Sequence, residues 1–225
     1  MPSGAAPALT HVVWDWNGTL FDDFDLTARI AGRTLAELGV PDVTGEDIRA
    51  SFRRPFSEFY ANLFGRPVTD AEFGFIRERY EIEYEAEVFG LRLQPDAAEA
   101  VDLVSARATQ SLLSMAPDGQ LQQLIDHHGV RSWFVRIEGS PRDDSDGNKA
   151  GRMAVHLRAA GVDPASTVVI GDTVDDHEAA LVNGTRSVLV TTGSTSRSQL
   201  EATGAPVVDT LREAAVVALE VSQRQ

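Results

Sequence analysis

Five polar residues in this sequence could do chemistry together if the fold brought them to one place. Asp15 ends the apolar stretch VVW, and Asp172 with Asp176 follows the apolar stretch VVI. Three carboxylates that converge repel one another unless a cation lies between them. Hard oxygen ligands in small number suit Mg²⁺, which usually shares its coordination shell with substrate phosphate. The hydroxyl of Ser114 and the ammonium of Lys149 suit a phosphoryl oxygen.

The lysine carries a signal of its own. The chain has 20 basic residues, and Lys149 is the one lysine among 19 arginines. An ammonium is a compact charge with three rotatable donors, which a planar guanidinium does not reproduce. The count therefore favours a functional role for Lys149.

The surrounding pattern predicts an α/β fold. Runs rich in Val, Ile and Leu predict strands over 11–15, 109–114, 133–138, 167–171, 187–191 and 206–208. Between and after the later runs, helical patterns occupy about 95–107, 117–128, 147–160, 174–183, 196–203 and 210–222. Pro117 suits a first helical position, and Ser196 with Gln199 has the form of a capping box. This alternation predicts a doubly wound parallel sheet, in which the carboxyl ends of the strands form the ligand-binding edge.

The alternation fails over residues 22–92, where no strand pattern occurs. Helical patterns cover 25–38, 45–64 and 69–90 instead. We therefore predict an inserted all-helical cap domain at 22–92, with the α/β core formed by 1–21 and 93–225.

Composition excludes several classes of function. The formal net charge of −14 disfavours nucleic acid and anionic membranes as partners, and the absence of cysteine excludes disulfides and thiolate chemistry. The first ten residues carry no signal-peptide pattern, and no apolar run approaches the roughly 18 residues that span a bilayer. We expect a cytoplasmic protein with a small-molecule partner, either monomeric or homodimeric.

DWNGT, then Ser114, then Lys149, then GDTVDD form an ordered set of motifs. This set resembles the haloacid dehalogenase superfamily, and the helical insertion resembles the cap of its phosphoglycolate-phosphatase-like branch. The resemblance extends over roughly residues 10–220. It implies a Rossmann-like core and a Mg²⁺-dependent hydrolase that removes phosphate from a small phosphorylated metabolite.

The resemblance also implies roles for individual residues. Asp15 matches the nucleophile, which forms an aspartyl-phosphate and so divides one difficult displacement into two easier steps. The metal ligands implied are Asp15, the backbone carbonyl of Asn17, Asp172 and Asp176. The core residues expected to contact substrate are Gly18, Thr19, Ser114, Met115 and Lys149, with Ser114 and Lys149 also catalytic. In the cap, Arg53 and Arg54 precede Pro55, and we predict that they bind a second anionic group of the substrate.

One position departs from the family pattern. Phosphatases of this family usually have Asp where this chain has Asn17, and that acid protonates the leaving group and activates water. An amide does neither, and proton transfer is typically worth about 10²–10⁴-fold, or about 3–5 kcal/mol of barrier. The hydrolysis rates of aryl and acyl phosphates would fall least, because their leaving groups need a proton least. Two alternatives stay open: an impaired member that binds a phosphometabolite or a protein partner, and a phosphotransferase with slowed hydrolysis.

Overall fold

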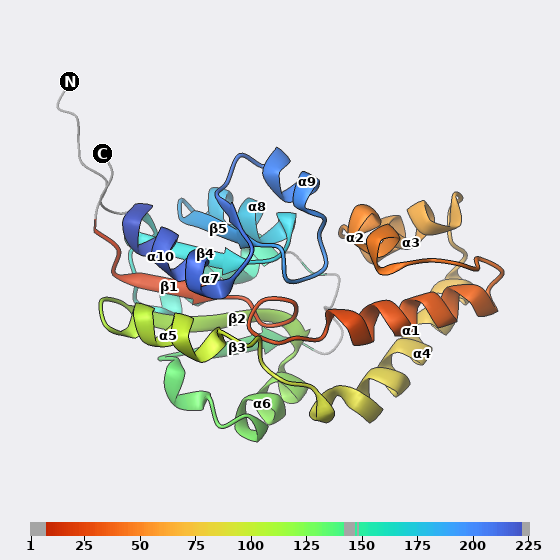
Figure 1. Cartoon of the computed structure of the whole chain (residues 1–225), viewed down its shortest axis with the longest axis horizontal. Coiled ribbons are helices and arrows are strands. Elements are labelled where there is room, and N and C mark those ends of the chain that lie inside the picture. Colours follow the sequence, from red (N-terminus) through yellow and green to blue (C-terminus); the bar gives the residue numbers. More distant parts are fainter. Residues whose placement is uncertain (1–7, 142–146, 148, 222–225) are drawn as a thin grey trace.

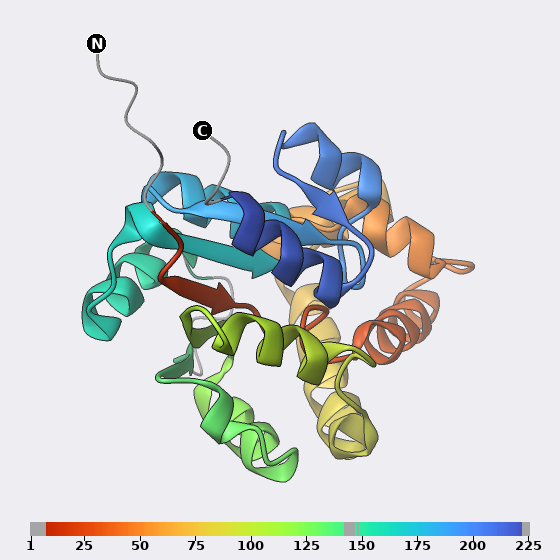
Figure 2. The same ribbon diagram turned by 60° about the vertical axis from the view of Figure 1, so that its left-hand side comes forward.

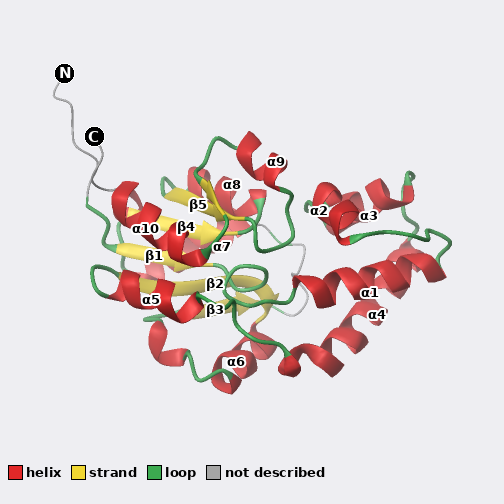
Figure 3. Cartoon of the chain, in the orientation of Figure 1, coloured by secondary structure: helices red, strands yellow, loops and turns green. Residues whose placement is uncertain are grey.

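The protein is built on one six-stranded parallel sheet. The computed structural model describes residues 8–141, 147 and 149–221. The strands lie in the order β3-β2-β1-β4-β5-β6 (Figures 1 and 3). Their bounds are β1 His11–Trp14, β2 Thr109–Pro117, β3 Ile137–Ser140, β4 Thr167–Gly171, β5 Arg186–Val190 and β6 Val207–Val208. The predicted doubly wound α/β class is confirmed.

Helices cover both faces of this sheet because alternate side chains of each buried strand point to opposite sides. Val12 and Trp14 pack into the larger hydrophobic cluster, whereas Val13 packs into a second one. The first face carries α5 (Ala97–Ser105), α6 (Asp118–His127) and α10 (Leu211–Val221). The opposite face carries α7 (Lys149–Ala160) and α8 (Val174–Val182), while α9 (Arg197–Ala202) lies beyond β5 (Figure 2).

The strand order fixes where a ligand can bind. The chain moves outward from β1 through β2 to β3 and then returns to place β4 on the other side of β1. The order therefore reverses between β1 and β4, and a crevice forms outside the carboxyl ends at such a point. Trp14 and Ile170 pair across this junction. Asp15 and Asp172 follow these two neighbouring strands.

The segment between β1 and α5 is helical. It contains α1 (Phe24–Glu37), α2 (Gly45–Ser51), α3 (Phe56–Phe64) and α4 (Asp70–Glu87), followed by a short 3₁₀ helix at Val88–Gly90. These helices lie beyond the carboxyl edge of the sheet (Figure 1) and share a hydrophobic cluster of their own. The domain limits at 22 and 92 stay a prediction.

The single helix predicted over 45–64 is wrong, because the chain forms two. Pro55 has no amide hydrogen to donate and disfavours helical geometry at Arg54. Accordingly α2 ends at Ser51 and α3 starts at Phe56. The break places Phe52 and Arg54 in an irregular segment that faces the core.

Three other local expectations need correction. Strand β2 continues to Pro117, with an irregular register against β3 after Leu113, so Ser114 lies within the strand and Pro117 only precedes α6. Strand β3 covers 137–140, because a 3₁₀ helix occupies Arg131–Trp133. The Ser196 hydroxyl donates to Gln199 Oε1 over 2.8 Å and caps no backbone N–H.

Candidate active site

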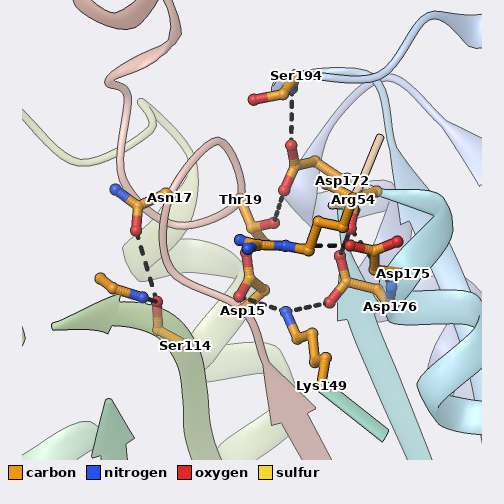
Figure 4. Close-up of polar contacts among 12 residues, drawn as sticks. Asp15, Asn17, Thr19, Arg54, Ser114, Lys149, Asp172, Asp175, Asp176 and Ser194 are labelled. Atoms are coloured by element: carbon orange, nitrogen blue, oxygen red, sulfur yellow. Dashed lines mark hydrogen bonds and ion pairs between the residues drawn. The ribbon is translucent and has the colours of Figure 1, made fainter. Parts of the chain in front are cut away.

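Three carboxylates converge at the carboxyl edge of the sheet. Asp15 follows β1, Asp172 follows β4, and Asp176 lies in the first turn of α8. One oxygen from each lies within 4.8 Å of the others, and all three side chains are buried (Figure 4). The Asp15 amide donates to the Ile170 carbonyl over 2.9 Å, so the first acid is fixed beside β4. The structure therefore brings together the three acids expected from the sequence.

Lys149 reaches into this cluster from the first residue of α7. Its Nζ lies 2.7 Å from Asp15 Oδ1 and 2.5 Å from Asp176 Oδ1. Burial opposes its charge, but attraction by Asp15 and Asp176 outweighs burial and raises the pKa of Lys149 above its usual value. The single lysine of the chain is thus a cation held against Asp15 and Asp176.

The cluster carries more negative charge than Lys149 neutralises, since three carboxylates face one ammonium. Burial raises the pKa of Asp15 to about 6, although Lys149 opposes the shift. Burial, reinforced by repulsion from Asp15 and Asp176, raises the pKa of Asp172 well above its usual value. A divalent cation would relieve this repulsion, and the all-oxygen donor set fits Mg²⁺.

Asp172 is held by groups from two other loops. Thr19 Oγ1 donates to Asp172 Oδ1 over 3.0 Å, and the Ser194 amide donates to Oδ2 over 2.7 Å (Figure 4). Glycine is needed beside this carboxylate, because a Cβ on Gly193 would lie 1.9 Å from Oδ2. Gly18 has φ of +69°, and a Cβ there would lie 2.6 Å from the same oxygen. These contacts orient Asp172 from outside its own strand.

Asp176 is fixed by a capping box at the start of α8. Its Oδ2 accepts from the Thr173 amide over 3.1 Å and from the Thr173 hydroxyl over 2.6 Å. The same helix end supports the adjacent carboxylate of Asp175. The cap occupies one oxygen of Asp176 and leaves Oδ1 facing Lys149.

Asn17 is held by a small network that the sequence reasoning missed. Its Nδ2 donates to Asp23 Oδ2 over 2.7 Å and to the Tyr84 hydroxyl over 2.9 Å. Tyr84 also donates to Asp23 Oδ2 over 2.7 Å, and the Gly18 amide donates to Oδ1 over 2.8 Å. The buried Asp23 thus needs donors around it, and the amide of Asn17 provides one where a carboxylate would repel. The sequence offered one indication of this network, the adjacent acids Asp22 and Asp23 that follow DWNGTLF.

Ser114 faces Asn17 on one side of the acidic cluster. Its hydroxyl accepts from the Ala116 amide over 3.0 Å and points to Asn17 Oδ1 at 3.5 Å (Figure 4). Ser114 and its neighbour Met115 both line the cavity above Asp15. The hydroxyl is therefore placed to meet a group bound there.

A cavity of about 330 Å³ extends from Asp15 into the helical segment. Arg54 lines it, and its Nε lies 3.1 Å from Asp175 Oδ2. Arg53 is exposed and is not among the lining residues, so the structure brings only the second of the two arginines to the site. Arg49 of α2 donates to the Gly193 carbonyl over 2.8 Å. The helical segment thus contacts the loop that holds Asp172.

Comparison with known proteins identifies the family. The model of the haloacid dehalogenase-like hydrolases matches residues 12–181, and a second, HAD-hydrolase-like model matches residues 149–214. This chain belongs to the haloacid dehalogenase-like hydrolases. In this hydrolase the matched region contains all three clustered acids and Lys149.

Known proteins resemble this hydrolase over nearly its whole length, in sequence or in fold. A curated relative, Probable phosphatase IndB of Dickeya dadantii, is 24% identical over 208 residues, which is 90% of each chain. The crystal structure of a predicted phosphatase from Clostridium acetobutylicum has a TM-score of 0.78 at 18% identity, covering 95% of this chain and 99% of its own. A predicted phosphoglycolate phosphatase from Haemophilus somnus has a TM-score of 0.72 at 16% identity, covering 93% and 97%. Such low identities show the fold alone.

No helix within residues 8–141 and 149–221 of this hydrolase has both the length and the apolar character to cross a membrane.

Proposed function

We propose that this hydrolase is a Mg²⁺-dependent phosphatase that cleaves a small phosphorylated metabolite through an aspartyl-phosphate on Asp15. The observation that carries the proposal is the cluster of three buried acids with Lys149, open to a cavity large enough for such a ligand. The phosphatase names of its relatives agree with this activity.

In the first step, an Asp15 carboxylate oxygen attacks phosphorus and the bond from phosphorus to the ester oxygen breaks. The leaving oxygen departs with the electron pair and takes a proton from solvent water, since Asn17 cannot donate one. In the second step, water attacks the same phosphorus, the bond to Asp15 breaks, and inorganic phosphate leaves. Lys149 holds Asp15 in its charged form and faces the phosphoryl oxygens, while Ser114 offers them a hydroxyl.

The residues that would hold Mg²⁺ are Asp15, Asp172 and Asp176, with the carbonyl of Asn17. When bound, the ion would neutralise charge that develops on the phosphoryl oxygens. Thr19 and Ser194 orient Asp172 for this purpose, and Lys149 limits the repulsion among the acids.

Phosphate release from an aryl phosphate and a panel of phosphometabolites, with and without Mg²⁺, tests the proposal. We expect turnover by the wild type and a loss of about 10⁴-fold or more in Asp15→Asn, since the attacking oxygen is removed. The matched control is Asp102→Asn, an exposed acid on α5, which should keep full activity. Equal activity in wild type and Asp15→Asn would contradict the aspartyl-phosphate. Peptide mapping should exclude deamidation of Asn17.

One observation favours a second candidate function, a protein that binds phosphate compounds without hydrolysing them. Asn17 cannot transfer a proton, and its amide is already engaged by Asp23 and Tyr84. Silence of the wild type on every phosphate compound, together with Mg²⁺-dependent binding of those compounds, would support this alternative. Transfer of the phosphoryl group to an alcohol acceptor instead of water would support the phosphotransferase.

A further inference from the structure

From the walls of the cavity we infer the substrate class: an aryl phosphate, which is a phosphate monoester whose leaving group is a phenol without a further charged group. This inference rests on the proposed phosphatase function. It assigns the core end of the cavity to the phosphate and the helical end to one or two aromatic rings.

Aromatic and aliphatic side chains surround the helical end of the cavity. These side chains belong to the four helices α1 to α4 and to the break between α2 and α3. The aromatic members are Phe52, Phe56, Phe59, Tyr60, Phe73, Tyr80 and Tyr84. Several of these rings already contact one another. The ring centroids of Phe52 and Phe59 lie 5.6 Å apart in a tilted pair, those of Tyr60 and Phe73 lie 6.2 Å apart edge to face, and Tyr80 stacks on Tyr84. A flat ring could extend this arrangement, because aromatic pairs gain energy beyond simple burial.

The charges near this end do not suit a second anionic group. Arg54 is ion-paired with Asp175 at 3.1 Å and lies over the ring of Phe56 at 4.6 Å. Arg77 is paired with Glu81 at 3.7 Å, four residues along α4. Among the described residues that line the cavity, these arginines and Lys149 are the cations, and each has a carboxylate beside it. A leaving group with a carboxylate or a second phosphate would have to compete with these acids for the cations.

The chemistry at Asn17 points to the same class independently. An alkoxide is too basic to leave without a proton, whereas a phenol has a pKa of about 10 and leaves far more readily. For an aryl ester, Asp15 displaces the aryloxide, which carries the electron pair away and takes its proton from water. The amide at Asn17 therefore costs an aryl phosphate much less than an alkyl one.

Four substrates separate ring binding from leaving-group quality. These are 1-naphthyl phosphate (aromatic, good leaving group), benzyl phosphate (aromatic, poor), acetyl phosphate (small, good) and glycerol phosphate (small, poor). With Mg²⁺, we expect 1-naphthyl phosphate to have the highest kcat/KM. Benzyl phosphate should lose mainly kcat, and acetyl phosphate should show a higher KM.

A pair of variants on one helix locates the ring-binding end. Phe73 and Phe75 are both half-buried in α4, and only Phe73 lines the cavity. Phe73→Ala should lower kcat/KM for 1-naphthyl phosphate about tenfold, whereas Phe75→Ala should leave it within twofold. Acetyl phosphate turnover checks that the site is intact, and Phe73→Leu covers the case in which the alanine variant does not fold.

The outcomes separate this inference from the proposed function. Turnover of glycerol phosphate as efficient as that of 1-naphthyl phosphate overturns the aryl assignment and leaves the phosphatase standing. Silence on all four compounds overturns the phosphatase. Calorimetric binding of 1-naphthyl phosphate and glycerol phosphate to Asp15→Asn then decides the ligand class: tighter binding of the naphthyl compound supports it, and equal binding overturns it.

Discussion

Two buried polar clusters lie on the same sheet, and they differ in charge and access. The acidic cluster of Asp15, Asp172, Asp176 and Lys149 lies at the carboxyl edge and lines the cavity through three of its members. The second cluster, which we call the histidine cluster, consists of His11, Ser111, His156 and Glu138. It lies between the strands and α7, where Ser111 and both histidines are completely buried.

The histidine cluster is internally satisfied. Ser111 Oγ lies 2.7 Å from the Nε2 atoms of both His11 and His156. His11 Nδ1 meets Thr109 Oγ1 at 2.7 Å, and His156 Nδ1 meets Glu138. Burial, with a contribution from the neighbouring His156, lowers the pKa of His11 to about 4, so this imidazole is neutral at pH 7.

The comparison teaches that residue types and distances alone do not make an active site. Glu138, His156 and Ser111 are ordered like an acid–base–nucleophile triad, but the serine and the histidine have no exposed surface. Every ring nitrogen of the cluster already has a partner. The acidic cluster instead has uncompensated negative charge that faces a cavity, and the proposed site for a cation and a substrate rests on this excess.

The largest expected effect concerns Lys149. Lys149→Met should lower phosphate release by about 10²–10³-fold, because the charge facing the phosphoryl oxygens is lost. Lys149→Arg should not restore full activity, since a planar guanidinium does not fit between Asp15 and Asp176. Steady-state kinetics with saturating Mg²⁺ measure both. A methionine variant with more than a tenth of wild-type activity would remove Lys149 from the chemistry.

The next largest effect concerns Ser111, whose replacement should lower stability and leave catalytic activity unchanged. Ser111→Ala removes the hydroxyl between two buried imidazoles, which should lower the free energy of unfolding by about 2–4 kcal/mol. Activity per folded molecule should stay within twofold. Chemical denaturation and kinetics on the same preparation check this, with the exposed Ser132→Ala as a control. Loss of turnover in folded Ser111→Ala would break the contrast between the two clusters.

Acid should weaken the histidine cluster. The folded-state pKa of His11 is about 4 and its ordinary value is 6.5, so its contribution is complete above pH 6.5 and is lost as pH falls towards 4. The loss should reach about 2–3 kcal/mol. The measurement is the difference in unfolding free energy between wild type and His11→Gln, which should shrink from pH 7 to pH 4. A difference that stays constant or grows would contradict the neutral imidazole.

The smallest expected effect is the change in stability when Asn17 is replaced. Asn17→Asp places a second carboxylate against Asp23 and should cost about 1–2 kcal/mol of stability. Adding Asp23→Asn should restore most of that loss, because donor and acceptor are then exchanged. Denaturation of the two single variants and the double variant gives the coupling free energy. Additive effects would show that Asp23 does not hold the amide.

The same variants test the chemical role of residue 17. Turnover of benzyl phosphate should rise more in the double variant than in Asn17→Asp alone, since the new acid is then free of Asp23. Turnover of 1-naphthyl phosphate should change little. An equal rise for both substrates would contradict the view that Asn17 limits leaving-group protonation.

Much of the fold could be predicted from local patterns. Apolar runs before Asp15 and before Asp172 predicted two parallel strands that end at one edge of the sheet, and the observed strand order makes them neighbours. Predictions from local patterns failed where a proline interrupted the helical spacing or where pairing with a distant strand extended an element. Pro55 divided a helix that the apolar spacing joined, and β2 continued past Ser114 because it pairs with β3 as far as Ser140.

The sequence by itself determined the residue types of the site: an acid after β1 at Asp15, the acids after β4, one lysine, and an amide at Asn17. These follow from motifs whose spacing is local to one strand end or one helix start. Only the tertiary structure decided how those residues are held. Asp23, Tyr84, Gly193 and Ser194 act across loops and helices that are distant in sequence, and the aromatic cavity requires four helices to pack together. Contacts of that kind depend on packing geometry, which no local pattern of residues encodes.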